Sequence, residues 1–88
     1  MTNGTLRVPL GLAKKGFSGQ IEALSTSEAL SAIPAVEIER RLIELGFVEG
    51  ARVEILHEGL IGRDPIAVRV NNATVALRRR EAMAILVS

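Results

Sequence analysis

Apolar residues repeat with a helical period in one segment of this chain. Between residues 34 and 45 they are spaced three or four apart, and charged residues occupy the opposite face. These apolar positions are Ala35, Ile38, Leu42 and Leu45. Pro34 suits the first helical position because its missing N–H would be unpaired there, and Gly46 supplies the left-handed residue that commonly follows a helix. The pattern therefore predicts one amphipathic helix over about residues 34–45, with Phe47 or Val48 folding back onto it.

After Gly50 the period changes to two, which is typical of short strands. The alternating apolar residues are Val53 and Ile55, then Ile66, Val68 and Val70, and finally Val75 and Leu77. Asn71 and Asn72 join the second and third runs in a tight hairpin turn, since Asn tolerates positive φ better than most residues. Residues 80–82 are predicted to form a short turn.

The two ends of the chain are predicted to pair with each other. Leu6–Leu10 is predicted to be a short segment at a sheet edge, because it contains Pro9. Gln20–Leu24 is predicted to be a strand that follows Gly19. A polar connector, Ser25–Ser31, leads to the helix, and Met83–Val87 is predicted as a closing strand. Five or six short strands with one inserted helix indicate a mainly β fold. We expect an SH3-like, partly open barrel rather than an OB fold, because the helix comes early and a meander ends the chain.

Length and composition limit the classes of protein that this chain can represent. It has 88 residues, no cysteine and one histidine, and we interpret residues 1–88 as a single domain. Disulfides, thiolate nucleophiles and Fe–S clusters are excluded because no cysteine is present. The longest apolar run, Ala82–Val87, is far shorter than the ~20 residues needed to span a bilayer, and no signal-peptide core begins the chain. We therefore expect a cytoplasmic protein without direct membrane insertion.

The charge balance argues against a nucleic-acid partner. The chain carries 11 basic and 10 acidic residues, a net charge of +1, whereas dedicated nucleic-acid binders are strongly basic. Arginines gather in the C-terminal third, at Arg63, Arg69, Arg78, Arg79 and Arg80. The aromatic residues that stack on single-stranded bases are missing from this region. The Arg78–Arg80 run is a solvated strand end, a contact for an acidic protein surface or, as the third alternative, a contact for nucleic-acid phosphates.

Two glycine-containing segments have the spacing of a nucleotide-binding or an RNA-binding motif, but neither has the other features that the motif requires. Residues 11–18 follow the spacing of a P-loop, but Phe17 stands where the phosphate-binding lysine is required. Residues 59–62 match the GxxG loop of KH domains, which joins two helices, whereas here the flanking segments read as strands.

Catalytic and metal-binding chemistry find equally little support. His57 with Glu54, Glu58 and Asp64 is the one imaginable metal cluster, but adjacent strand residues such as His57 and Glu58 point to opposite faces. No nucleophile, base and orienting group can be assembled from the remaining residues. We therefore expect no enzyme activity, no cofactor and no tight metal site.

Leu60 and Ile61 are two consecutive large apolar residues between glycines at the tip of a predicted loop. Two adjacent large apolar residues are seldom left in solvent without a role. Leu60 and Ile61 therefore either cover the core or form an exposed docking contact. Together with nearby basic residues they offer the apolar anchors and polar surround that protein interfaces need. The predicted partner-binding residues are Leu60, Ile61, Arg63, Arg78 and Arg79.

Several sequence blocks resemble the FeoA family when taken in order. They are RRLIELGFVEG at residues 40–50, VEIL at 53–56, GRDPIAVRV at 62–70, ALRRREA at 76–82 and AILV at 84–87. The resemblance extends from about Leu10 to Val87. It implies a cytosolic SH3-like barrel that serves as an accessory to the ferrous iron transporter FeoB, a membrane protein with a cytosolic GTP-binding domain. The same barrel resembles the C-terminal domain of iron-dependent repressors, where it makes protein contacts.

These observations lead to one hypothesis and two alternatives. The hypothesis is a non-enzymatic accessory or regulatory protein of ferrous iron uptake that docks to the cytosolic part of FeoB. The alternatives are a small-barrel nucleic-acid-binding module and a regulatory module that responds to a transition metal ion. Whether the protein activates, assembles or inhibits the transporter, and whether it forms homo-oligomers, stays open at this point.

Overall fold

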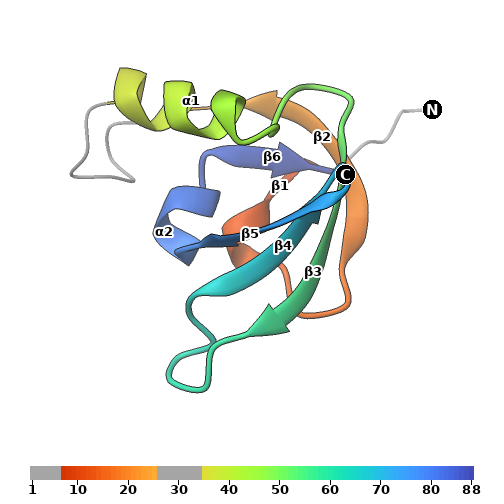
Figure 1. Ribbon diagram of the computed structural model, residues 1–88, viewed down its shortest axis with the longest axis vertical. Coiled ribbons are helices and arrows are strands. Elements are labelled where there is room, and N and C mark those ends of the chain that lie inside the picture. The colour runs from red at the N-terminus through yellow and green to blue at the C-terminus, as the bar shows by residue number, and fades with distance from the viewer. Residues whose placement is uncertain (1–6, 26–34) are drawn as a thin grey trace.

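The computed structural model describes residues 7–25 and 35–88, which form six strands, two α-helices and a 3-10 helix (Figure 1). In chain order the elements are β1 (Val8–Pro9), η1 (Leu10–Leu12), β2 (Ser18–Leu24), α1 (Ala35–Glu44), β3 (Arg52–Glu58), β4 (Ile66–Val70), β5 (Ala73–Leu77), α2 (Arg79–Ala82) and β6 (Ile85–Val87). The predicted connector beyond Ser25 and the predicted helix start at Pro34 lie outside the described residues.

The six strands form one sheet in the order β1-β6-β2-β3-β4-β5, and every neighbouring pair is antiparallel. Strand β2 belongs to both halves of this sheet, because Ser18–Gln20 pair with β3 whereas Ile21–Leu24 pair with β6. A register shift between Ile21 and Ala23 bends β2 at this junction, as β-bulges commonly do. The bend curls the sheet into a partly open barrel, and the predicted SH3-like fold class is confirmed.

The core is aliphatic and lies inside the curled sheet. Its buried members are Leu10, Ile21, Ile38, Leu42, Phe47, Val53, Ile55, Ile66, Val68, Val70, Leu77, Ala82, Ala84, Ile85 and Val87. Six of these fifteen side chains come from the alternating positions predicted after Gly50, and α1 contributes Ile38 and Leu42. No buried polar side chain is found within the described ranges. Apolar burial therefore holds this fold together.

Helix α1 ends as the sequence predicted, with Gly46 at φ +104°. The Gly46 N–H donates to the Ile43 carbonyl at 3.0 Å, and the Phe47 N–H donates to the Leu42 carbonyl at 2.9 Å. These two bonds form a Schellman motif, which satisfies carbonyls that the helix leaves unpaired. Phe47 is fully buried whereas Val48 is exposed, so Phe47 is the residue that folds back into the core.

Replacing Gly46 with valine is expected to lower the free energy of unfolding by about 1–2 kcal/mol, because a β-branched residue resists positive φ. A side chain here would also approach the Asn71 amide nitrogen, 3.1 Å from an ideal Cβ position. Urea denaturation followed by circular dichroism measures the loss. Glu44→Val is the control, since it places the same side chain at an exposed position of ordinary helical geometry, where about 0.5 kcal/mol is expected. Equal losses in the two variants would contradict the cap.

The C-terminal third agrees with the sequence predictions in its hairpin and departs from them at residues 80–82. Asn71 has φ +57° in the turn between β4 and β5, which confirms the predicted hairpin. The turn predicted at 80–82 is wrong, because these residues belong to the short helix α2. The Asp64 carboxylate accepts the backbone N–H of Arg79 at 2.9 Å, and the Glu81 carboxylate accepts that of Arg78 at 3.0 Å. These carboxylates satisfy N–H groups at the start of the helix.

The closing strand is shorter than predicted and pairs with two partners. Strand β6 begins at Ile85 instead of Met83. It pairs with β1, as the sequence predicted, and its other edge pairs with β2. The two ends of the described chain therefore lie together in the barrel (Figure 1).

Candidate partner-docking site

The loop between β3 and β4, residues 59–65, is an ordered turn with a closed base. The Gly59 N–H donates to the Pro65 carbonyl at 2.8 Å, and the Asp64 N–H donates to the Ile61 carbonyl at 3.4 Å. Gly62 and Arg63 both have positive φ, 66° and 57°. A side chain at Gly59 would collide with the backbone of Asp64, so glycine is required where the two arms of the loop meet.

Leu60 and Ile61 project from the tip of this loop into solvent. Their exposed fractions are 103% and 89%, the two highest among the exposed large hydrophobic residues of the described chain. Of the two roles that the sequence left open, covering the core is therefore wrong. Their role as docking contacts stays a prediction at this stage.

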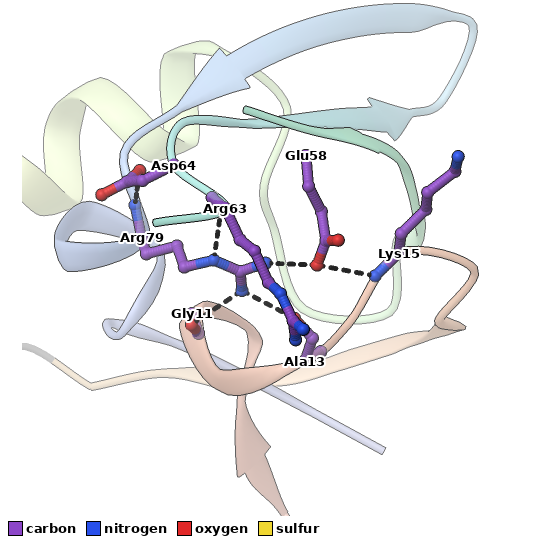
Figure 2. A network of polar contacts seen from close by, with 7 residues as sticks. All are labelled: Gly11, Ala13, Lys15, Glu58, Arg63, Asp64 and Arg79. Atoms are coloured by element: carbon purple, nitrogen blue, oxygen red, sulfur yellow. Dashed lines mark hydrogen bonds and ion pairs between the residues drawn. The ribbon is translucent and has the colours of Figure 1, made fainter. Parts of the chain in front are cut away.

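Arg79 joins the loop to the rest of the barrel, as Figure 2 shows. Its Nη1 donates to the carbonyls of Gly11 at 3.0 Å and Ala13 at 2.6 Å, and its Nε donates to the Arg63 carbonyl at 2.7 Å. Its Nη2 forms an ion pair with Glu58 at 2.7 Å. The guanidinium thus connects η1 and the segment after it with the end of β3 and with the loop.

The partners of Arg79 are themselves held in place. Glu58 also accepts the backbone N–H of Lys15 at 3.1 Å, so its carboxylate bridges two segments. The Arg79 and Glu58 side chains are only 19% and 18% exposed. Because four acceptors already occupy the guanidinium, Arg79 has little capacity left for a partner. We interpret it as a positioning residue that supports the loop.

Arg63 and Arg78, the other two predicted basic residues, have exposed side chains in different settings. Arg63 is separated from the tip residue Ile61 by Gly62, and in Figure 2 its side chain crosses in front of the Arg79 guanidinium. Arg78 lines an open cleft of about 370 Å³ together with Arg41 and Arg80. The structure therefore places Arg63 in the same loop as Leu60 and Ile61, whereas Arg78 belongs to the cleft beside β5 and α2.

Leu12 is an exposed residue that the sequence analysis did not single out. It is 68% exposed and lies between Gly11 and Ala13, the two residues whose carbonyls Arg79 binds. Leu12 is thus carried on a segment tied to the same guanidinium as the loop tip. No sequence pattern marks it, because a single exposed leucine is common on protein surfaces.

The residues considered for metal binding lie apart from one another on the barrel. Residues 7–25 and 35–88 contain no group of three or more His, Cys, Asp or Glu side chains placed to hold a metal ion. His57 is exposed and lies opposite Ala67 on β4, whereas Glu54 lies opposite Arg69. No helix of the described chain is long and apolar enough to cross a membrane.

Comparison with known proteins gives a consistent result. The model of the FeoA domain family matches residues 8–88. FeoA from Stenotrophomonas maltophilia, solved with zinc and described as a prokaryotic SH3 domain protein, is 32% identical over 96% of this chain and 91% of its own, with a TM-score of 0.72. FeoA from Chlorobium tepidum is 35% identical over 91% of this chain and 68% of its own, with a TM-score of 0.71.

More distant similarity extends to metal-dependent regulators. A manganese-dependent transcriptional repressor is 21% identical, with a TM-score of 0.74 over 96% of this chain and 37% of the repressor. At this level of identity the similarity shows a shared fold alone. A search of curated proteins found no match.

Proposed function

Because the chain belongs to the FeoA family, we propose that it is a non-enzymatic accessory protein of bacterial ferrous iron transport that docks to the cytosolic part of the FeoB transporter. The description of the Stenotrophomonas relative connects that protein with activation of bacterial ferrous iron transport. One structural observation supports docking above all, namely the two almost fully exposed apolar side chains, Leu60 and Ile61, on a loop with a closed base.

The loop has the physical properties of a docking element. Burying a leucine or isoleucine side chain contributes about 1.5–3 kcal/mol, and this contribution is available at both tip positions. An already ordered loop loses little conformational entropy on binding, so more of this free energy becomes affinity. The exposed Arg63 side chain beside the tip can steer an acidic partner. The proposed docking residues are therefore Leu60, Ile61 and Arg63 in contact, with Arg79 supporting them and Arg78 at a flank.

Truncating Leu60 and Ile61 together to alanine is expected to weaken binding to the purified cytosolic domain of FeoB at least tenfold, about 1–2 kcal/mol. The fold should be retained, because neither side chain contacts the core cluster. Isothermal titration calorimetry measures the affinity. Ile43→Ala is the matched control, since Ile43 is 47% exposed on α1, outside the loop. If the double variant binds with wild-type affinity, the loop is a connector and not a docking element.

Reversing the charge of Arg63 is expected to act on the kinetics of the same interaction. Arg63→Glu should slow association and flatten its salt dependence, because a charge beside an interface mainly steers the encounter. Stopped-flow mixing at several salt concentrations measures both effects. Arg52→Glu, an exposed reversal on β3, is the control for the change in net charge. If the two reversals slow association equally, overall charge rather than the loop steers the partner.

A further inference from the structure

The two edges of the sheet differ in how they are protected. Strand β1, at one edge, has only two residues and one of them is Pro9. Strand β5, at the other edge, has the sequence Ala-Thr-Val-Ala-Leu over Ala73–Leu77. Natural proteins protect exposed edges with charges, prolines, bulges or very short strands, and β5 has none of these devices. Its edge is therefore suited to pairing with another strand.

The hairpin geometry identifies the backbone groups that face this open edge. Val70 and Ala73 flank the two-residue turn and form its hydrogen-bonded pair. Hydrogen-bonded pairs alternate along an antiparallel ladder, so Val75 and Leu77 also turn their backbone groups towards β4. The backbone N–H and C=O groups of Thr74 and Ala76 therefore point away from β4. Among the described residues, neither of them takes part in a hydrogen bond with a turn, loop or other strand.

A basic cleft lies at the C-terminal end of this edge. Ala76 and Leu77 of β5 line it together with Arg41, Arg78 and Arg80. The acidic residue of the cleft, Glu81, is already bound to Arg41 at 2.9 Å and to the Arg78 N–H at 3.0 Å. Arg78 and Arg80 are exposed and have no ion pair within the described ranges. The cleft therefore carries uncompensated positive charge.

We propose that β5 binds an extended acidic peptide segment of a partner protein, which adds a strand to the sheet and places its carboxylates at Arg78 and Arg80. The backbone groups of Thr74 and Ala76 supply the main-chain bonds of such strand addition. Antiparallel pairing is the more stable arrangement, so the acidic residues precede the paired segment in the peptide. This site is separate from the Leu60–Ile61 tip and does not rest on the role proposed for that loop.

Charge favours this occupant over a second copy of the chain. Strand β5 and the turn before it, Asn71 and Asn72, contain no acidic residue. Two copies paired through β5 would therefore bring no carboxylate from this strand or its turn to Arg78 or Arg80. An acidic peptide satisfies both the open backbone groups and the two arginines.

Nuclear magnetic resonance on the ¹⁵N-labelled full chain tests the proposal. The probe is a synthetic peptide in which a run of aspartates precedes alternating valines and threonines. Its controls carry asparagines in place of the aspartates, or the aspartates at the opposite end. With the probe, amide exchange at Thr74 and Ala76 should slow about tenfold or more, while Ala73 and Val75 should change little because they already bond to β4. Both control peptides should bind about tenfold more weakly.

Two variants extend the test. Arg78→Gln combined with Arg80→Gln should weaken the acidic peptide about tenfold and leave the asparagine peptide unaffected. Ala76→Pro removes an outward N–H at an edge position, where proline is tolerated, and should abolish binding of both peptides. If Ala76→Pro does not fold, the amide-exchange measurement at Thr74 and Ala76 of the wild-type chain is the test of strand addition. The proposal is overturned if Thr74 and Ala76 gain no protection, if the asparagine peptide binds equally well, or if sedimentation shows the free chain dimerising through β5.

Discussion

Arg79→Ala is expected to lower the free energy of unfolding by about 3 kcal/mol or more, because it removes one partner of a mostly buried ion pair. The Glu58 carboxylate would lose the guanidinium, and the carbonyls of Gly11, Ala13 and Arg63 would lose their donor. Each of these groups sits at a junction between segments that are distant in sequence. Circular dichroism during urea denaturation measures the loss, since the chain contains no tryptophan or tyrosine for fluorescence.

Two further variants show whether geometry or charge causes this effect. Arg79→Lys keeps the charge but cannot present the planar fork to four acceptors, so we expect it to recover only part of the stability. Arg80→Ala removes the neighbouring exposed arginine and should stay within about 0.5 kcal/mol of the wild type. If alanine at 79 and alanine at 80 cost the same, the network of Figure 2 does not support the loop.

Most of the fold could be predicted because burial follows local periodicity. Val68 and Val70 are buried while Arg69 between them is exposed, and the helix turns Ile38 and Leu42 inward in the same predictable manner. Turn chemistry was equally informative, since the positive φ of Gly46 and Asn71 lies at residues that tolerate it. These features are readable because each depends on neighbours within a few positions along the chain.

The role of Arg79 could not be predicted, because it depends on contacts across the fold. Arg78, Arg79 and Arg80 are chemically identical in sequence, yet only Arg79 reaches Gly11, 68 positions away. The same limit explains the error at residues 80–82, where the helix is capped by Asp64, 15 positions from Arg79. Glu81 supplies one capping carboxylate from within the helix, but the other, from Asp64, lies in a different loop and gives no local signal.

The ambiguity at Leu60 and Ile61 had a related cause. Two apolar residues between glycines can fold inward or outward, and the local sequence is the same in both cases. The direction is decided by the closed base at Gly59 and Pro65 together with positive φ at Gly62 and Arg63. A non-glycine residue with positive φ is uncommon and gives no strong signal in a sequence.

Phe47→Ala is expected to cost about 3–5 kcal/mol of unfolding free energy, the usual range for truncating a buried phenylalanine. Phe47 is completely buried and belongs to the same core cluster as Leu42 of α1 and Val70 of β4. Its ring therefore packs in the core directly after the Gly46 cap, and its loss leaves a cavity between the helix and the sheet. Since domains of this kind are stable by about 5–15 kcal/mol, the variant should lose a large part of its stability.

Val48→Ala is the matched control for Phe47→Ala, because Val48 is the adjacent residue and is 42% exposed. A small loss is expected there, since Val48 is already partly exposed and its truncation leaves no buried cavity. Amide exchange adds a spatial test: in Phe47→Ala the amides of α1 should exchange faster than those of β3 and β4, because the helix depends on this contact to stay on the barrel. Uniform acceleration across the chain would mean that helix and barrel unfold as one unit, with Phe47 acting as an ordinary core residue.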